Sequence, residues 1–229
     1  MQTNAYGQAI GHSLRDFQAG ELPQVQLLQG QYCRLEKIGT AHTEDLWAVY
    51  NDKTPAQNWT YLPPKYGPFA DKNDFSAFMQ EMMQSQDPYH FAIIEQADGK
   101  ALGTFLLMRI DRANRSVEVG VVIYGEALKR SRIAGEAQFL LAQYVFEQLR
   151  YRRYEWKCDS LNDPSRRAAL RLGFQFEGIF RQDLVYHGRN RDTAWFSMLD
   201  SEWAANKARF QRWLAADNFD VQGRQKTPL

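Results

Sequence analysis

A short basic segment near the middle of the chain has the composition of an anion-binding site. It contains Lys129, Arg130 and Arg132, and a helical pattern of apolar residues begins at Ile133. The first N–H groups of a helix have no partner inside the helix, and the helix dipole adds partial positive charge there. The segment therefore predicts a place for a phosphate or pyrophosphate. The alternative is a solvated basic helix start without a ligand.

The sequence lacks the signatures of other phosphate-binding sites and of metal sites. The basic turn does not end in Gly-Lys-Ser/Thr, as a Walker loop does, and no glycine fingerprint of a dinucleotide fold opens the chain. The two cysteines, Cys33 and Cys158, are not at metal-ligand spacing, and the histidines are scattered. We expect neither a metal site nor a disulfide scaffold.

Composition narrows the class of protein. A chain of 229 residues can form one large domain, and its net charge of +1 gives no global field for nucleic acid. Few cysteines indicate a reducing, cytoplasmic setting. No signal peptide is evident, and no apolar run approaches the roughly 20 residues of a membrane helix. We expect a cytoplasmic protein without membrane or nucleic-acid partners.

The elements that must position the basic turn follow from hydrophobic periodicity. The pattern predicts a strand at 116–124, a helix from 133 to 149 and a strand at 153–158, a β–α–β crossover with parallel strands. Alternating patterns elsewhere predict antiparallel strands, the last two joined at His187-Gly188. Further strands are expected at 25–28, 32–38 (these two as separate strands or one bent strand), 90–95, 101–109, 174–186 and 191–199, and helices at 40–50, 72–86, 163–172 and 202–215.

Three segments carry a resemblance to a known family. They are Glu-Val-Gly-Val-Val-Ile at 118–123, Lys-Arg-Ser-Arg-Ile-Ala-Gly-Glu-Ala at 129–137, and Asn-Asp-Pro-Ser-Arg-Arg-Ala-Ala-Leu-Arg-Leu-Gly-Phe at 162–174. In this order and spacing they resemble the GNAT superfamily of N-acetyltransferases, within the Rim-type branch that acetylates ribosomal-protein N-termini. The resemblance implies an α/β fold: a mixed, largely antiparallel twisted sheet of about seven strands with helices on both faces. We expect an arm at 1–22, the acetyltransferase domain at 23–200, and a C-terminal helix and tail at 201–229.

The resemblance also implies acetyl-CoA as co-substrate and a cofactor site. The pyrophosphate would lie on the basic turn and the pantetheine arm on the strand before it. Arg132 stands where the family usually has glycine; a helical conformation would keep its N–H available, whereas a positive φ would cost roughly 1–2 kcal/mol. The residues expected to bind the cofactor are Val121, Ile123, Arg130, Ser131, Arg132, Ile133, Ala134, Gly135 and Asn162.

The chemistry of acetyl transfer asks for a base and an acid. A primary amine is protonated at neutral pH and must lose a proton before it attacks. Glu118 is the candidate base, at a position where the family commonly has a catalytic carboxylate; the alternative is a glutamate that faces solvent or pairs with an arginine. Ala169 replaces the tyrosine that many members use as acid, so Ser165 is the substitute, with a capping hydroxyl as its alternative. Cys158 is expected to be a small buried residue rather than a nucleophile.

These inferences predict an enzyme that moves an acetyl group from acetyl-CoA to a primary amine by direct attack. The acceptor is a protein N-terminus or a small amine, and the aromatic segment 59–69 with the final hairpin is expected to shape its pocket. One alternative is a CoA-binding sensor or interaction module without turnover; a nucleic-acid binder that uses Arg130, Arg132, Arg166 and Arg167 is disfavoured by the net charge. The oligomeric state stays open, with a homodimer among the alternatives, because the C-terminal helix can cover either the core or a partner.

Overall fold

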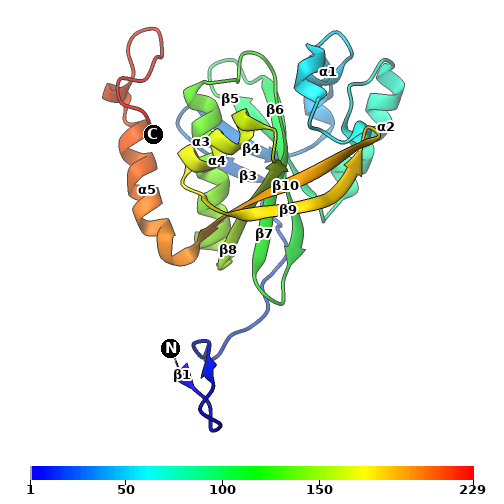
Figure 1. The fold of residues 1–229 in the computed structure, drawn as a ribbon. Helices are drawn as coiled ribbons and strands as arrows, with labels where there is room; N and C mark the ends of the chain where they lie inside the picture. The colour runs from blue at the N-terminus through cyan, green and yellow to red at the C-terminus, as the bar shows by residue number, and fades with distance from the viewer. Residues whose placement is uncertain (1) are drawn as a thin grey trace.

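A computed structural model, which describes residues 2–229, has one large mixed sheet with helices on both of its faces (Figure 1). The eight strands of this sheet run in the order β3-β4-β5-β6-β7-β8-β10-β9, and a separate hairpin lies at the N-terminus. The strands are β1 (Gln2–Thr3), β2 (Ala9–Ile10), β3 (Leu27–Gln29), β4 (Cys33–Lys37), β5 (Tyr89–Glu95), β6 (Ala101–Asp111), β7 (Ser116–Tyr124), β8 (Arg153–Asp159), β9 (Gln175–Tyr186) and β10 (Arg189–Leu199). The α-helices are α1 (Thr43–Tyr50), α2 (Lys72–Gln84), α3 (Arg132–Gln143), α4 (Asp163–Leu172) and α5 (Asp200–Leu214).

The expected elements all form, and the first strand segment resolves into two strands. Leu28 of β3 pairs with Leu35 of β4 in an antiparallel register. The chain reverses at Gly30, where a Cβ atom would lie 2.6 Å from the carbonyl oxygen of Cys33. Only glycine fits this approach of backbone to backbone. The sheet therefore has eight strands. It would have seven if the first segment formed a single bent strand.

Two hydrophobic layers cover the sheet, one on each face. Val117 and Val119 of β7 point into the larger layer, which contains the buried side of α3. Ile123 of the same strand points into the smaller layer, with the buried residues of α1 and α2. The alternation of a β-strand places Glu118 on the face opposite to Val117 and Val119, the face that α1 and α2 partly cover.

Among the described residues, β7 and β8 are the only parallel neighbours in the large sheet, and they separate along their length. Ser116 to Val119 pair with Arg153 to Trp156, and no pairing between the two strands follows. On its other side β7 has a bulge, because Gly120 pairs with Leu106 but Ile123 pairs with Thr104. Val121 lies in this bulge with φ of 46°, an uncommon conformation for a β-branched residue. The bulge turns β7 away from β8, so the facing edges of the two strands open.

The C-terminal helix covers the core of its own chain. Trp203, Phe210 and Trp213 are buried, and α5 packs against α3. A Cβ atom on Gly135 of α3 would lie 2.4 Å from a ring carbon of Trp213, so this glycine lets the two helices approach closely. The sequence allowed this helix to cover either the core or a partner, and in the structure it covers the core. Among the described residues, no helix has both the length and the apolarity to cross a membrane.

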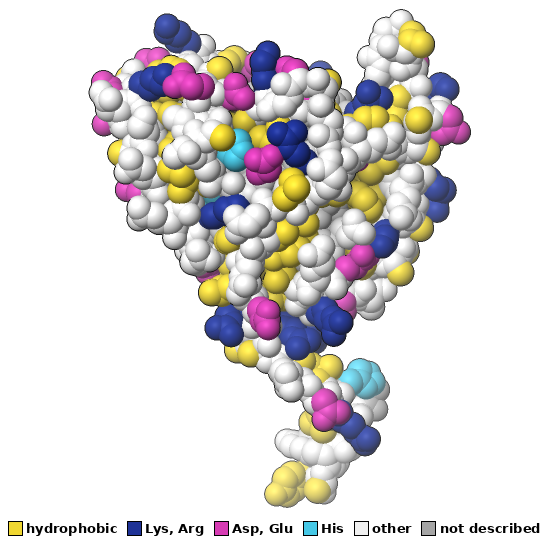
Figure 2. All heavy atoms as spheres, turned by 180° about the vertical axis from the view of Figure 1, so that it is seen from behind, with side chains coloured by type: hydrophobic (Ala, Val, Ile, Leu, Met, Phe, Trp, Pro, Cys, Tyr) yellow, Lys and Arg dark blue, Asp and Glu magenta, His cyan; other side chains and the backbone are white. Residues whose placement is uncertain are grey.

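The surface has no extended region of one charge on the face seen in Figure 2. Basic and acidic side chains alternate over the body of the molecule on this side, and the N-terminal segment projects from it. Such a mixture gives no broad positive potential on this face.

Candidate active site

The opening between β7 and β8 brings together the carboxylate, the basic turn and the start of α4. β7 leads into the turn before α3, and β8 leads into the turn before α4. Both helices therefore begin at the same end of the sheet, beside the place where the two strands separate (Figure 1). Unpaired strand edges offer backbone N–H and C=O groups to an extended ligand. Val121 and Ile123, the residues expected to pair with pantetheine, lie on the opened part of β7.

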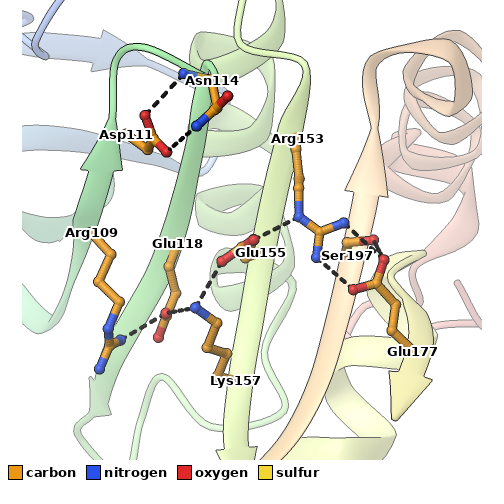
Figure 3. Close-up of polar contacts among 9 residues, drawn as sticks. All are labelled: Arg109, Asp111, Asn114, Glu118, Arg153, Glu155, Lys157, Glu177 and Ser197. Carbon is orange, nitrogen blue, oxygen red and sulfur yellow. Dashed lines mark hydrogen bonds and ion pairs between the residues drawn. The ribbon is translucent and has the colours of Figure 1, made fainter. Parts of the chain in front are cut away.

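Glu118 is held in the sheet by two cations (Figure 3). Its side chain is only 4% exposed, and Oε2 lies 2.7 Å from Arg109 Nη1 and 3.0 Å from Lys157 Nζ. The other oxygen, Oε1, has no hydrogen bond to a described residue. A Cβ atom on Gly120 would lie 3.4 Å from Oε1, so this oxygen is directed along β7 toward the opening. The sequence alternative of an arginine pair is thus realised at one oxygen, while the second stays available for a proton.

The ion pairs continue from β7 to β8 and β9 on the same face. Lys157 Nζ also lies 2.8 Å from Glu155 Oε2, and Arg153 joins Glu155 to Glu177 of β9. This pairing with Arg153 lowers the pKa of Glu177 to about 2, because the guanidinium stabilises the carboxylate. Ser197 Oγ donates to the same carboxylate at 2.6 Å. The row of alternating charges therefore fixes the side chains around Glu118 rather than leaving them mobile.

The basic turn offers free backbone donors, as the sequence predicted. Ser131 caps α3: its Oγ accepts from the N–H of Ala134 at 3.1 Å and donates to the carbonyl oxygen of Leu128 at 2.7 Å. The N–H groups of Arg130, Arg132 and Ile133 have no hydrogen-bond acceptor among the described residues. Together with the helix dipole they form a seat for an anion.

Only one of the three basic side chains is free to face that anion. Lys129 Nζ is 2.7 Å from both Glu126 Oε1 and Asn58 Oδ1. Arg132 stacks on aromatic rings, with its guanidinium carbon 4.1 Å from the centroid of Tyr32. Arg130 is exposed and pairs with no acidic group among residues 2–229.

The conformation of Arg132 answers the question raised by the missing glycine. Arg132 is the first residue of α3, whereas the positive φ of 58° belongs to Arg130. No glycine is needed at a helical position, so the substitution leaves the backbone of the turn intact. The guanidinium lies on Tyr32, and the idea that it clamps a phosphate finds no support in this arrangement.

The start of α4 places Asn162 and Ser165 beside the end of β8. Asn162 is the N-cap, and its Oδ1 accepts from the N–H of Ser165 at 3.2 Å. Ser165 Oγ accepts from the indole nitrogen of Trp156 at 3.0 Å, so its hydroxyl proton can be donated either to the neighbouring Cys158 sulfur or to a ligand. Ala169 is fully buried, so a tyrosine there would have no room. Burial raises the pKa of the Cys158 thiol, which agrees with a structural rather than a nucleophilic role.

The aromatic segment meets the final hairpin across the same face. His187 Nε2, at the turn between β9 and β10, is 2.8 Å from the carbonyl oxygen of Leu62. Arg189 donates to the carbonyl oxygen of Thr60 at 3.2 Å, and the hydroxyl of Tyr61 donates to that of Leu161 at 3.1 Å. Segments distant in the sequence thus form one wall beside the opening.

Sequence reasoning missed the cations that surround the carboxylate. Arg153, Glu155 and Lys157 alternate with buried Tyr154 and Trp156 along β8. This period-2 pattern already places all three charged residues on one face of the strand. Their meeting with Glu118 depends on the register of β7 and β8, which a single sequence does not contain.

The chain is similar to known proteins in sequence and in fold. Residues 33–175 match the family model described as an acetyltransferase (GNAT) domain. A crystal structure of a GCN5-related N-acetyltransferase from Brucella melitensis is 46% identical, covers 94% of this chain and 97% of that chain, and superposes with a TM-score of 0.90.

Two Bacillus proteins are also similar. YdaF of Bacillus subtilis (strain 168), named provisionally as a ribosomal N-acetyltransferase, is 32% identical over 110 residues, which are 48% of this chain and 60% of YdaF. The uncharacterized N-acetyltransferase p20 of Bacillus licheniformis is 30% identical over 60% of this chain and 78% of its own length. The match thus spans less than two thirds of YdaF. Members of the matched family take acetyl-CoA as co-substrate, and the extent of the family match establishes that this chain belongs to the GNAT family of acetyltransferases.

Proposed function

We propose that the protein transfers an acetyl group from acetyl-CoA to a primary amine by direct attack. The observation that carries this proposal is the position of Glu118 Oε1, which is free of partners and directed toward the opening between β7 and β8. The free N–H groups of the turn before α3 would hold the pyrophosphate, and the opened edge of β7 would hold the pantetheine arm. Asn162 would support the split between the strands from the start of α4.

The proton and electron balance assigns a role to each group. The acceptor ammonium gives one proton to Glu118 Oε1, directly or through water, and its nitrogen attacks the thioester carbon. A backbone N–H of the β7 bulge stabilises the oxygen that gains negative charge. The C–S bond then breaks, and the second proton from nitrogen reaches the thiolate through the Ser165 hydroxyl. Glu118 returns its proton to solvent, so one acetylamine, one thiol and one proton result.

The acceptor belongs to one of two classes in this proposal, a protein N-terminus or a small amine. The name of the relative YdaF, a ribosomal N-acetyltransferase, favours a ribosomal protein as acceptor. The wall formed by the aromatic segment and the final hairpin would contact this acceptor. Two free and buried cysteines support a reducing, cytoplasmic setting as part of the same proposal.

An acetylation screen tests the proposal. Small amines, aminated antibiotics and N-terminal peptides are each incubated with acetyl-CoA, and thiol release is followed. The expected result is release with one acceptor class and a loss of about 10²-fold or more in kcat/KM for Glu118→Gln. If acetyl-CoA raises the melting temperature but no acceptor releases thiol, a CoA-binding sensor replaces the enzyme. If acetyl-CoA at millimolar concentration gives no thermal shift, cofactor binding itself is refuted.

A further inference from the structure

Lys157 is a cation enclosed by the sheet. Its side chain is 9% exposed, and its ammonium lies 3.0 Å from Glu118 Oε2 and 2.8 Å from Glu155 Oε2. The ring of Trp195, on the neighbouring strand β10, has its centroid 3.7 Å from the same nitrogen. Two carboxylates and an aromatic face therefore hold the ammonium in one place, where solvent screens it little.

The position of Lys157 along β8 places this cation at the opening. Trp156 is the last residue of β8 that pairs with β7, and Lys157 follows it directly. The ammonium therefore reaches across the first unpaired step of the two strands and bonds to Glu118. This contact joins the strands by side chains at the point where their backbone pairing ends.

The two oxygens of Glu118 consequently have different surroundings. Oε2 contacts both cations, Arg109 from β6 and Lys157 from β8. Oε1 contacts neither cation and lies 3.4 Å from the place of a Cβ atom on Gly120, while the Met108 side chain packs against the same glycine. A carboxylate is planar, so fixing Oε2 between two strands also fixes where Oε1 points.

We propose that Lys157 is the positioning residue of the active site, which pairs the negative charge of Glu118 and directs Oε1 toward the acceptor amine. This inference rests on the proposed function, in which Glu118 accepts the proton. Arg109 holds the same oxygen, but its side chain is 51% exposed, so water and salt screen its charge more strongly. The charged groups that face the Glu118–Lys157 pair are Arg109 from β6 and Glu155 from β8, the latter itself paired with Arg153.

The contact with Lys157 is tested by carboxyl-carbon NMR at one pH on protein labelled with ¹³C at the glutamate carboxyl, where the Glu118 signal is identified by its loss in Glu118→Gln. Lys157→Met is expected to move this signal, because the ammonium that contacts Oε2 is removed. Lys157→Arg, which keeps the charge, is expected to move it less. Lys72→Met, which breaks an exposed ion pair with Glu44 elsewhere, is the matched control and should move nothing. An unchanged Glu118 signal in Lys157→Met overturns the inference.

A kinetic measurement separates this inference from the proposed function. The dependence of kcat/KM on pH is recorded with two acceptors whose amines differ in pKa. The rise of kcat/KM that occurs at the same pH with both acceptors is the limb of the profile that belongs to the enzyme. That limb should move to higher pH in Lys157→Met, and in Lys157→Gln if the methionine variant does not fold. If Glu118→Gln abolishes the limb but both lysine variants leave it in place, Lys157 has only a structural role and the function stands. If the wild type turns over no acceptor, the function fails, while the NMR signal of Glu118 still decides the pairing.

Discussion

The indole nitrogen of Trp156 donates a hydrogen bond to the hydroxyl oxygen of Ser165 at 3.0 Å. The donor comes from β8 and the acceptor from the first turn of α4, so the bond joins the opened sheet to the helix that follows it. The hydroxyl oxygen is fixed, while its proton can turn from the neighbouring Cys158 sulfur toward a ligand. This is the arrangement that a donor to a leaving sulfur requires.

Removal of that hydroxyl should slow the chemical step. Ser165→Ala is expected to lower kcat about 10- to 100-fold with little change in KM for acetyl-CoA, because a thiolate leaves less readily without a proton donor. Trp156→Phe keeps the hydroxyl but loses its orientation, so an intermediate loss is expected. Steady-state thiol release measures both, and Ser201→Ala on the exposed side of α5 is the control. Equal kcat for Ser165→Ala and wild type would leave Ser165 as a helix residue without a part in the reaction.

The basic turn should respond unequally to loss of its charges. Arg130→Ala is expected to raise KM for acetyl-CoA about five- to tenfold, since a charge-assisted bond to phosphate is lost. Lys129→Ala should have a smaller effect, because Lys129 is already paired with Glu126 and Asn58. The comparison at two ionic strengths is informative, as salt should reduce the Arg130 effect. A larger effect at Lys129 than at Arg130 would contradict this assignment of the phosphate seat.

Glu136 should govern stability rather than catalysis. Its buried carboxylate accepts from the N–H groups of Gln31, Tyr32 and Cys33 at 2.7–2.8 Å, which fastens the β3–β4 turn to α3. Glu136→Gln loses the charge and one acceptor oxygen, so we expect about 2–4 kcal/mol lower free energy of unfolding. Urea denaturation measures it. Glu44→Gln, at a surface ion pair with Lys72, should change stability by less than about 0.5 kcal/mol.

His90 should make the fold sensitive to mild acid. Burial, with smaller contributions from Lys37 and Lys65, lowers the pKa of His90 from 6.5 to about 3. Below pH 6.5 the unfolded chain takes up a proton that the folded protein does not, so stability falls as the pH drops through this window. The loss from this residue should reach roughly 2 kcal/mol at pH 5.

Two histidine variants test whether His90 causes this loss of stability. His90→Phe should flatten the stability profile between pH 7 and pH 5, as measured by urea denaturation. His12→Gln, in the exposed N-terminal segment, should leave the slope unchanged. A profile with the wild-type slope in His90→Phe would show that another group carries the acid sensitivity.

The contacts that hold the aromatic segment in place should affect the acceptor only. Tyr61→Phe removes the bond to the carbonyl oxygen of Leu161, and His187→Ala removes the bond to that of Leu62. We expect KM for the acceptor to rise several-fold, with KM for acetyl-CoA unchanged, because this wall is proposed to contact the acceptor, whereas the turn before α3 and the edge of β7 are proposed to hold the cofactor. A rise in KM for acetyl-CoA instead would place the wall at the cofactor.

The sequence alone determined the elements and their order. The periodicity from Ser116 to Asp159 predicted a strand, a helix and a parallel strand, and the Ser131 cap marks the start of that helix. Local signals suffice here because capping and alternation act between near neighbours in the chain. The helix predicted at 163–172 likewise forms as α4, bounded by Asn162 and by Gly173, which has the left-handed conformation that ends a helix.

The tertiary structure decided what those elements hold. The sequence marked Glu118, but the two cations on its Oε2 come from β6 and β8, 9 and 39 residues away along the chain, and meet it only through strand register. The position of the Arg132 side chain also depends on a distant residue. Its guanidinium stacks on Tyr32, one hundred residues earlier in the chain, instead of facing the basic turn. Pairing between strands fixes which side chains share a face and which charges lie within bonding distance. That information resides in contacts between distant segments, so only the folded chain contains it.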